Sequence, residues 1–107
     1  MTPTMTLRAA LAAAGILLGP SPSFARVIHI AVQSLSFGTM PTDARVGDVI
    51  AWDNQDIVDH TATAQDRSFD TELPAGETSR TVLRKAGTIR ITCRYHPKMS
   101  AVLVIRN

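Results

Sequence analysis

The sequence has 107 residues, of which 45% are hydrophobic, and it carries a formal net charge of +2 at pH 7. Its 11 basic and 9 acidic residues form no basic stripe of the kind found in nucleic-acid-binding domains, so we expect no nucleic-acid partner. The single cysteine cannot form a disulfide within the chain, which excludes the class of small exported domains that disulfides stabilise.

Residues 1–25 differ in composition from the rest of the chain. An apolar run extends from Leu7 to Leu18 with one positive charge, Arg8, and the segment ends in the small-x-small sequence "SFA". This pattern is typical of a secretory signal peptide that is cleaved after Ala25, although an N-terminal amphipathic helix or anchor is the alternative. The run is shorter than the roughly 17 to 25 residues of a membrane-spanning helix. We therefore predict export to the periplasm, no membrane span and one small domain over residues 26–107.

From Arg26 onward, apolar and polar residues alternate with a period of two, which is typical of strands. Turn residues such as Gly, Pro and Asp separate the runs, and no window shows helical spacing. Six short strands at such spacing predict an all-β sandwich or small barrel. The stretch 65–74 is less regular and is compatible with a loop, an edge strand or a short helical turn. The six predicted strands are "RVIHIAV", "GDVIAWDN", "DHTATAQ", "TSRTVL", "GTIRITC" and "SAVLVIRN".

The segment "CRYHPKM" follows the fifth of these strands. Cys93 continues the apolar face of Ile89 and Ile91, so its sulfur should point toward the core. His96 precedes a proline, which disfavours helical backbone and predicts a shaped loop before the last strand. Upstream, His60 shares a strand face with small apolar residues and should also point inward.

A cysteine, two histidines and a weakly bound methionine are the ligands of a blue copper site, because soft sulfur suits Cu(I) and imidazole suits Cu(II). Zinc would have little use for Met99. Each residue also has a simpler interpretation: Cys93 as a buried structural thiol, His60 as an ordinary half-buried histidine and Met99 as core filler. A thiol redox sensor is disfavoured because Cys93 faces the core. His29 has no partner in sequence, and we do not expect it to be a ligand.

The segments "AGTIRITCRYHPKM" and "VGDVIAWDNQDIVDH" closely resemble those of the cupredoxins. The Cys-x-x-His-x-x-Met spacing is similar to that of the amicyanin-like branch, and the resemblance covers nearly all of residues 26–107. It implies a Greek-key β-sandwich of about seven to eight strands with one type 1 copper ion. Matching the family motif implies that His60, Cys93 and His96 are equatorial ligands and that Met99 is the axial ligand.

The resemblance also implies roles for two neighbours of the ligands. Asn54 is expected to tie the His60 loop to the Cys93 loop by hydrogen bonds, and Thr61 to brace the strand that bears Cys93. The chain departs from the family at Asp59, where proline is common, and at Lys98, where an apolar residue is common. Neither departure removes a ligand.

We therefore expect a small exported protein that is not an enzyme and that carries single electrons between protein redox partners by cycling between Cu(II) and Cu(I). The alternative function is a periplasmic copper carrier or buffer that delivers the metal to an acceptor. We expect a monomer whose partners dock around His96, Tyr95, Pro97 and Lys98. Such redox encounters use small interfaces whose charges tune the association rate.

Overall fold

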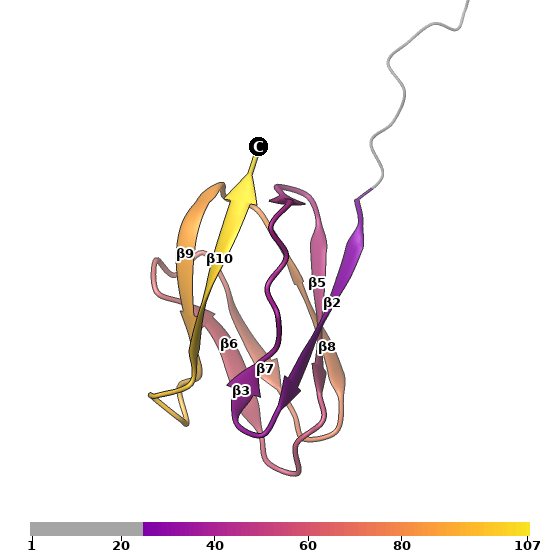
Figure 1. Ribbon diagram of the computed structural model, residues 1–107, viewed down its shortest axis with the longest axis vertical. Helices are drawn as coiled ribbons and strands as arrows, with labels where there is room; N and C mark the ends of the chain where they lie inside the picture. The colour runs from indigo at the N-terminus through magenta and orange to yellow at the C-terminus, as the bar shows by residue number, and fades with distance from the viewer. Residues whose placement is uncertain (1–24) are drawn as a thin grey trace, which may run out of the picture.

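The computed structural model describes residues 25–107, so the predicted signal peptide lies outside the described residues. In this part of the chain, nine strands form two sheets that pack face to face (Figure 1). The first sheet has the order β4 (Ala44–Arg45), β10 (Ser100–Arg106), β9 (Gly87–Thr92), β6 (His60–Ala64) and β7 (Asp70–Leu73). The second has the order β3 (Ser36–Phe37), β2 (Val27–Gln33), β5 (Val49–Asn54) and β8 (Thr78–Val82).

The predicted all-β sandwich is confirmed, and all six predicted strands are present. Two of the three additional strands, β3 and β4, have two residues each, which is too short for an alternating pattern to reveal. The third, β7, comes from the irregular stretch 65–74 and is an edge strand beside β6. Most pairs are antiparallel, but β2 runs parallel to β5 and β4 runs parallel to β10. Among residues 25–107 we find no helix long and apolar enough to span a bilayer.

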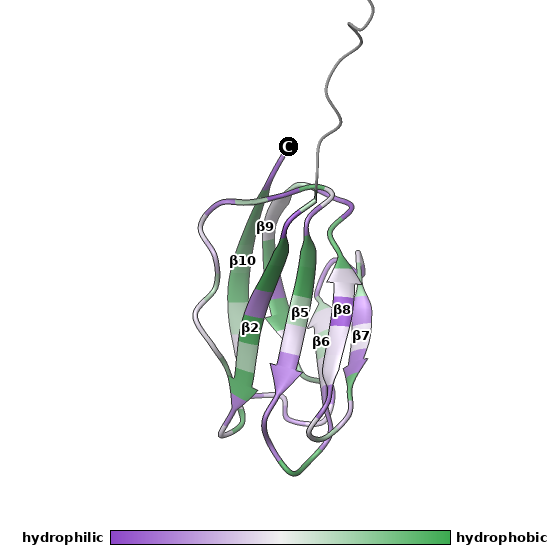
Figure 2. Cartoon of the chain, turned by 90° about the vertical axis from the view of Figure 1, so that its right-hand side faces the viewer, coloured by the Kyte–Doolittle hydropathy of each residue, from purple (hydrophilic) through white to green (hydrophobic). Residues whose placement is uncertain are grey.

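The core lies between the sheets and follows the alternation of the strands. In β9, Ile89 and Ile91 are buried while Arg90 is exposed. Trp52 of β5 is fully buried, and its ring packs edge-on against Phe37 with 5.8 Å between centroids. Figure 2 shows the resulting contrast between the largely hydrophobic β2 and β10 and the hydrophilic β7 at the sheet edge.

A chain of hydrogen bonds joins the two sheets where β7 and β8 meet. The indole N–H of Trp52 donates to Thr81 Oγ1 at 2.9 Å, and the hydroxyl of Thr81 lies 2.6 Å from that of Thr71 on the opposite sheet. Because buried polar groups are costly unless they are paired, these linked hydrogen bonds fix how the two sheets pack at that edge. Trp52 therefore acts as a core residue.

Asp48 organises the end of the sandwich where β5 begins. Its carboxylate accepts hydrogen bonds from the backbone N–H of Arg45 at 2.9 Å and of Arg26 at 3.2 Å, and from the Arg26 guanidinium at 3.2 Å. Burial alone raises the pKa of this carboxyl, but the bonds from Arg45 and Arg26 outweigh it and hold the pKa below its usual value. The carboxylate therefore stabilises this end of the fold while it is ionised.

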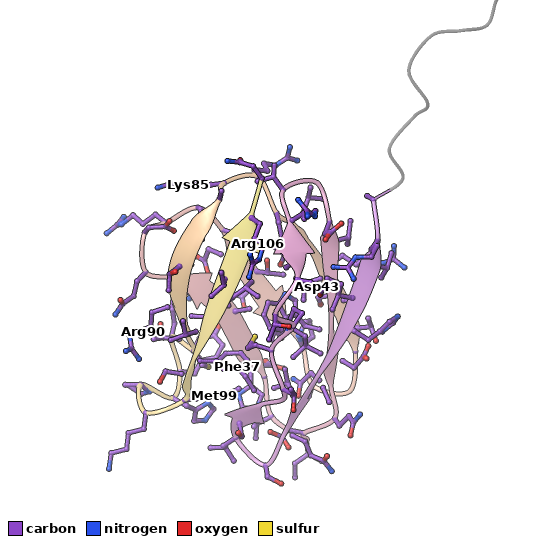
Figure 3. The ribbon with its side chains drawn as sticks, turned by 45° about the horizontal axis from the view of Figure 1, so that its top comes forward. Phe37, Asp43, Lys85, Arg90, Met99 and Arg106 are labelled. Atoms are coloured by element: carbon purple, nitrogen blue, oxygen red, sulfur yellow. The ribbon has the colours of Figure 1, made fainter. Side chains whose placement is uncertain are left out.

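The opposite end of the sandwich gathers four connections: the turn between β2 and β3, the loop 55–59, the turn 74–77 and the loop 93–99 (Figure 1). Met99 lies toward this end, whereas Lys85 lies at the other (Figure 3). The chain thus brings its candidate ligands together at the end of β5 that is farther from Asp48.

Candidate metal centre

Three potential ligand atoms meet at this end of the sandwich. His60 Nδ1 lies 3.8 Å from Cys93 Sγ, His96 Nδ1 lies 3.6 Å from the same sulfur, and the two nitrogens are 3.2 Å apart. His60 is the first residue of β6, Cys93 directly follows β9, and His96 lies in the loop 93–99. The structure therefore brings together three of the four predicted ligands as a compact triangle of donor atoms.

The loop 93–99 is closed by its own backbone. The N–H of Cys93 donates to the Met99 carbonyl at 3.2 Å, and the N–H of Met99 donates to the His96 carbonyl at 2.8 Å. Next to these bonds, Thr92 pairs with Ser100, so the base of the loop is continuous with the antiparallel pair β9 and β10. Cys93 and Met99 are both buried, with 1% and 4% exposure. Because the loop closes tightly, His96 lies close to Cys93 and Met99 packs in the core.

The donor set fits one metal ion. His60 Nε2 lies 2.7 Å from Asp56 Oδ2, which assigns the proton of the ring to Nε2 and leaves the lone pair of Nδ1 directed at the triangle. Bonds of about 2.0 to 2.1 Å to nitrogen and about 2.3 Å to sulfur are usual for metal sites with these ligands. One ion at such distances spans donor atoms that are 3.2 to 3.8 Å apart.

Thr61 connects the two ligand segments. Its backbone N–H points at Cys93 Sγ at 3.4 Å, and its hydroxyl oxygen accepts a hydrogen bond from the Arg94 N–H at 2.9 Å. Sulfur is a weak hydrogen-bond acceptor, and this N–H fixes the position of Cys93 Sγ relative to β6. The prediction that Thr61 braces the cysteine-bearing strand is confirmed.

The prediction that Asn54 ties the His60 loop to the Cys93 loop is wrong. Its side-chain amide donates to the carbonyls of Val58 and Leu73, and its oxygen accepts from the N–H of Asp56. Asn54 ends β5, and from there its short side chain reaches the loop 55–59 and the end of β7. It therefore shapes the loop that precedes His60, while Thr61 makes the connection between the ligand segments.

Asp56 is the functional residue that sequence analysis missed. Besides its contact with His60, its carboxylate accepts hydrogen bonds from the N–H groups of Ser34 at 2.7 Å and Leu35 at 2.9 Å. The Leu35 N–H is the main cause, followed by His60, that holds the pKa of Asp56 below its usual value. A carboxyl group four residues before a predicted ligand was the one available sign in the sequence.

The two histidines differ in exposure. His60 is fully buried, whereas His96 is partly exposed and borders a hollow of about 410 Å³. The hollow is lined by the predicted docking residues together with one that was not predicted: Tyr95, His96, Pro97, Lys98 and Leu35. Its lining is largely apolar, and Leu35 is 52% exposed.

The charges near this hollow are mostly neutralised. The Arg94 guanidinium pairs with Asp70 and Glu72, and Glu72 also accepts the hydroxyl of Tyr95 at 2.9 Å, which raises the pKa of Tyr95. Lys98 has no ion pair with any residue of the described range 25–107. It is therefore the unpaired cation of this surface.

His29 lies apart from the triangle. It is exposed on β2, and its Nδ1 lies 3.1 Å from a carboxylate oxygen of Asp53 on β5. Within residues 25–107, His60, Cys93 and His96 are the group of side chains arranged to hold a metal. His29 is therefore an exposed residue of β2.

Comparison with solved structures finds proteins of similar fold. It is similar to a methionine-to-glutamine variant of amicyanin in the Cu(I) state, with a TM-score of 0.61 and 19% identity over 75% of this chain and 82% of that one. A reduced proline-to-phenylalanine variant of amicyanin gives a TM-score of 0.63 and 22% identity over 81% and 95% of the two chains.

A copper-containing nitrite reductase from Thermus scotoductus SA-01 also matches, with a TM-score of 0.66 and 21% identity, over 89% of this chain but 26% of the enzyme. No model of a protein family matches the sequence, and no curated protein matches it. At these identities the likeness concerns the fold. The predicted resemblance to cupredoxins is confirmed at that level: residues 25–107 have the sandwich fold of amicyanin, with a His-Cys-His cluster at one end.

Proposed function

We propose that this protein is an exported blue copper protein that carries single electrons and is not an enzyme. Its ligands would be His60, Cys93, His96 and Met99. The observation that carries the proposal is the triangle of two imidazole nitrogens and one sulfur, with His60 already turned toward it by Asp56. This is the donor set that copper prefers when it alternates between two oxidation states.

When bound, copper supplies one-electron chemistry through Cu(II) and Cu(I). The protein's own part is to keep the donor atoms in one arrangement. His60 is held by Asp56, and Cys93 by the N–H of Thr61 and the closed loop. Burial of Cys93 and Met99 keeps water from the sulfur. Such fixed surroundings leave little to rearrange when an electron arrives or leaves.

The test is a titration of the purified protein with Cu(II). One equivalent should produce an intense visible band from sulfur-to-copper charge transfer, and stoichiometric reduction and reoxidation should remove and restore it. Cys93→Ser should remove the band, whereas Ser100→Ala, beside the loop but outside the triangle, should retain it. A colourless complex whose copper passes readily to a chelator would favour the alternative function, a copper carrier.

We further propose that redox partners dock over the hollow beside His96, because His96 is the member of the cluster that is partly exposed. The unpaired Lys98 would set the charge preference of this surface. Charge reversal with Lys98→Glu should change the salt dependence of electron-transfer rates with a charged redox protein. An unchanged salt dependence would contradict this assignment.

Export and assembly state need separate tests. We expect the protein in the periplasmic fraction with Arg26 as its first residue, which N-terminal sequencing would determine. We expect a monomer by sedimentation. Detection of the uncleaved chain in the membrane fraction would instead support the N-terminal anchor.

A further inference from the structure

The turn between β2 and β3 has an unusual backbone. Ser34 and Leu35 both have φ of +54°, a left-handed conformation that side-chain-bearing residues rarely adopt. Two-residue hairpin turns of this type normally use Asn-Gly, because these residues tolerate positive φ. A leucine in this position needs support from elsewhere in the fold.

Asp56 supplies that support. Its Oδ1 accepts the N–H of Ser34 and its Oδ2 accepts the N–H of Leu35, so both donors of the turn are satisfied by one carboxylate. Asp56 is itself fixed, because its N–H donates to Asn54 Oδ1 at 3.0 Å. Its side chain is 13% exposed, so water competes little for these bonds.

The same Oδ2 also accepts the Nε2–H of His60 at 2.7 Å. One oxygen atom therefore holds a buried candidate ligand and the amide of Leu35, a residue that lines the hollow beside His96. The candidate docking surface and the interior of the metal centre are joined through a single acceptor.

We propose that Asp56 is a positioning residue that fixes two things at once: the ring of His60 toward the metal, and the Leu35 turn at the edge of the docking hollow. The inference rests on the proposed function of the cluster. Displacement of the turn by a partner changes the bond that orients His60, so contact at Leu35 is transmitted to the centre without passing through His96.

The test compares Asp56→Ala, Asp56→Asn and the control Asp59→Asn. Asp59 belongs to the same loop, but its carboxylate accepts the N–H of Ala75 and does not contact His60. The measurements on the metal-free chain are amide hydrogen exchange at residues 34 and 35 and the ring ¹⁵N signals of His60. The measurements on the copper-loaded chain are the visible band and the reduction potential.

Asp56→Ala should speed exchange at Ser34 and Leu35 about tenfold or more, as expected for the loss of hydrogen bonds to a charged acceptor. It should also abolish the single His60 tautomer and shift the reduction potential. Asp59→Asn should leave all four readouts as in the parent. If the Asp56→Ala protein retains the parent's amide exchange and tautomer, the proposal is overturned.

Asp56→Asn keeps the inference testable should the alanine variant not fold. An amide has one acceptor oxygen, so it can keep the bonds to Leu35 and His60 only by turning its NH₂ toward Ser34. Exchange at Ser34 should rise about tenfold while the His60 tautomer persists. Unchanged exchange at Ser34 would refute the assignment. A parent protein without a visible copper band would refute the proposed function alone, because the metal-free measurements still test Asp56.

Discussion

The two ends of β5 carry nearly the same arrangement around a carboxylate. Asp48, just before the strand, and Asp56, two residues after it, each accept two backbone N–H groups and one side-chain donor. At Asp48 the third donor is the partly exposed guanidinium of Arg26, and at Asp56 it is the fully buried imidazole of His60. The same device thus stabilises one end of the fold and orients a candidate ligand at the other.

The largest effect on stability should come from a substitution at the end of β5 that carries the candidate ligands. His60→Ala removes a buried ring and leaves Asp56 without its side-chain donor, so the free energy of unfolding of the metal-free protein should fall by about 2 to 4 kcal/mol. His96→Ala removes a partly exposed ring and should cost less than about 1 kcal/mol. Urea denaturation of both variants measures the difference. Equal losses would contradict the contrast between the two histidines.

Breaking the other end should have a smaller effect. Asp48→Asn keeps the size of the side chain but removes its charge, and the NH₂ group that replaces one carboxylate oxygen cannot accept the hydrogen bonds that this oxygen receives from Arg26 or Arg45. We expect a loss of about 1 to 2 kcal/mol at pH 7 by urea denaturation. The copper-binding properties should match the parent, because the change lies at the far end of β5. A changed visible band would show that the two ends are not independent.

Acid should reduce the difference in stability between the parent protein and Asp48→Asn. The folded-state pKa of Asp48 is lowered, so its contribution is fully present above the ordinary carboxyl value of about 3.9 and is lost as the pH falls through the folded-state pKa. The stabilities of the parent and of Asp48→Asn should therefore converge below about pH 4. Denaturation midpoints over a pH series measure this, and a constant gap would exclude Asp48 as the source.

The smallest effect should come from a third carboxylate, Glu72, which also has several donors but is 55% exposed. Glu72→Gln should leave thermal stability nearly unchanged, because exposed ion pairs contribute little. It should lower the pKa of Tyr95 toward its ordinary value, since the hydrogen bond to Glu72 is the main cause of its increase. Ultraviolet titration of the tyrosine detects this shift, and an unmoved pKa would contradict the assignment.

Local sequence patterns predicted much of this molecule because strands record burial with a period of two. The alternation in "TIRITC" correctly places Cys93 on the inner face, and the small residues near His60 correctly place that ring inside. Pro97, directly after His96, likewise indicates the loop that brings His96 close to Cys93. These features depend on neighbours a few residues away.

The parts that sequence reasoning missed depend on contacts between distant segments. In "QDIVDH" the two aspartates look alike, yet Asp56 contacts a turn more than twenty residues earlier while Asp59 contacts Ala75. The position of Leu35 beside His96 was missed for the same reason, because only the pairing of β2 with β3 brings it there. The role given to Asn54 was wrong because its reach was inferred from a motif rather than from where β5 ends.

The contact between Arg26 and Asp48 also defines how short the N-terminus can be. Cleavage after Ala25 would leave all of Arg26's bonds in place, whereas trimming one residue further would remove two of the donors to Asp48. Cleavage after Ala25 would also convert the backbone nitrogen of Arg26, which lies 3.2 Å from Asp48 Oδ1, from a neutral amide into a charged amine. Maturation at that bond would thereby add a positive charge where the fold already holds a carboxylate.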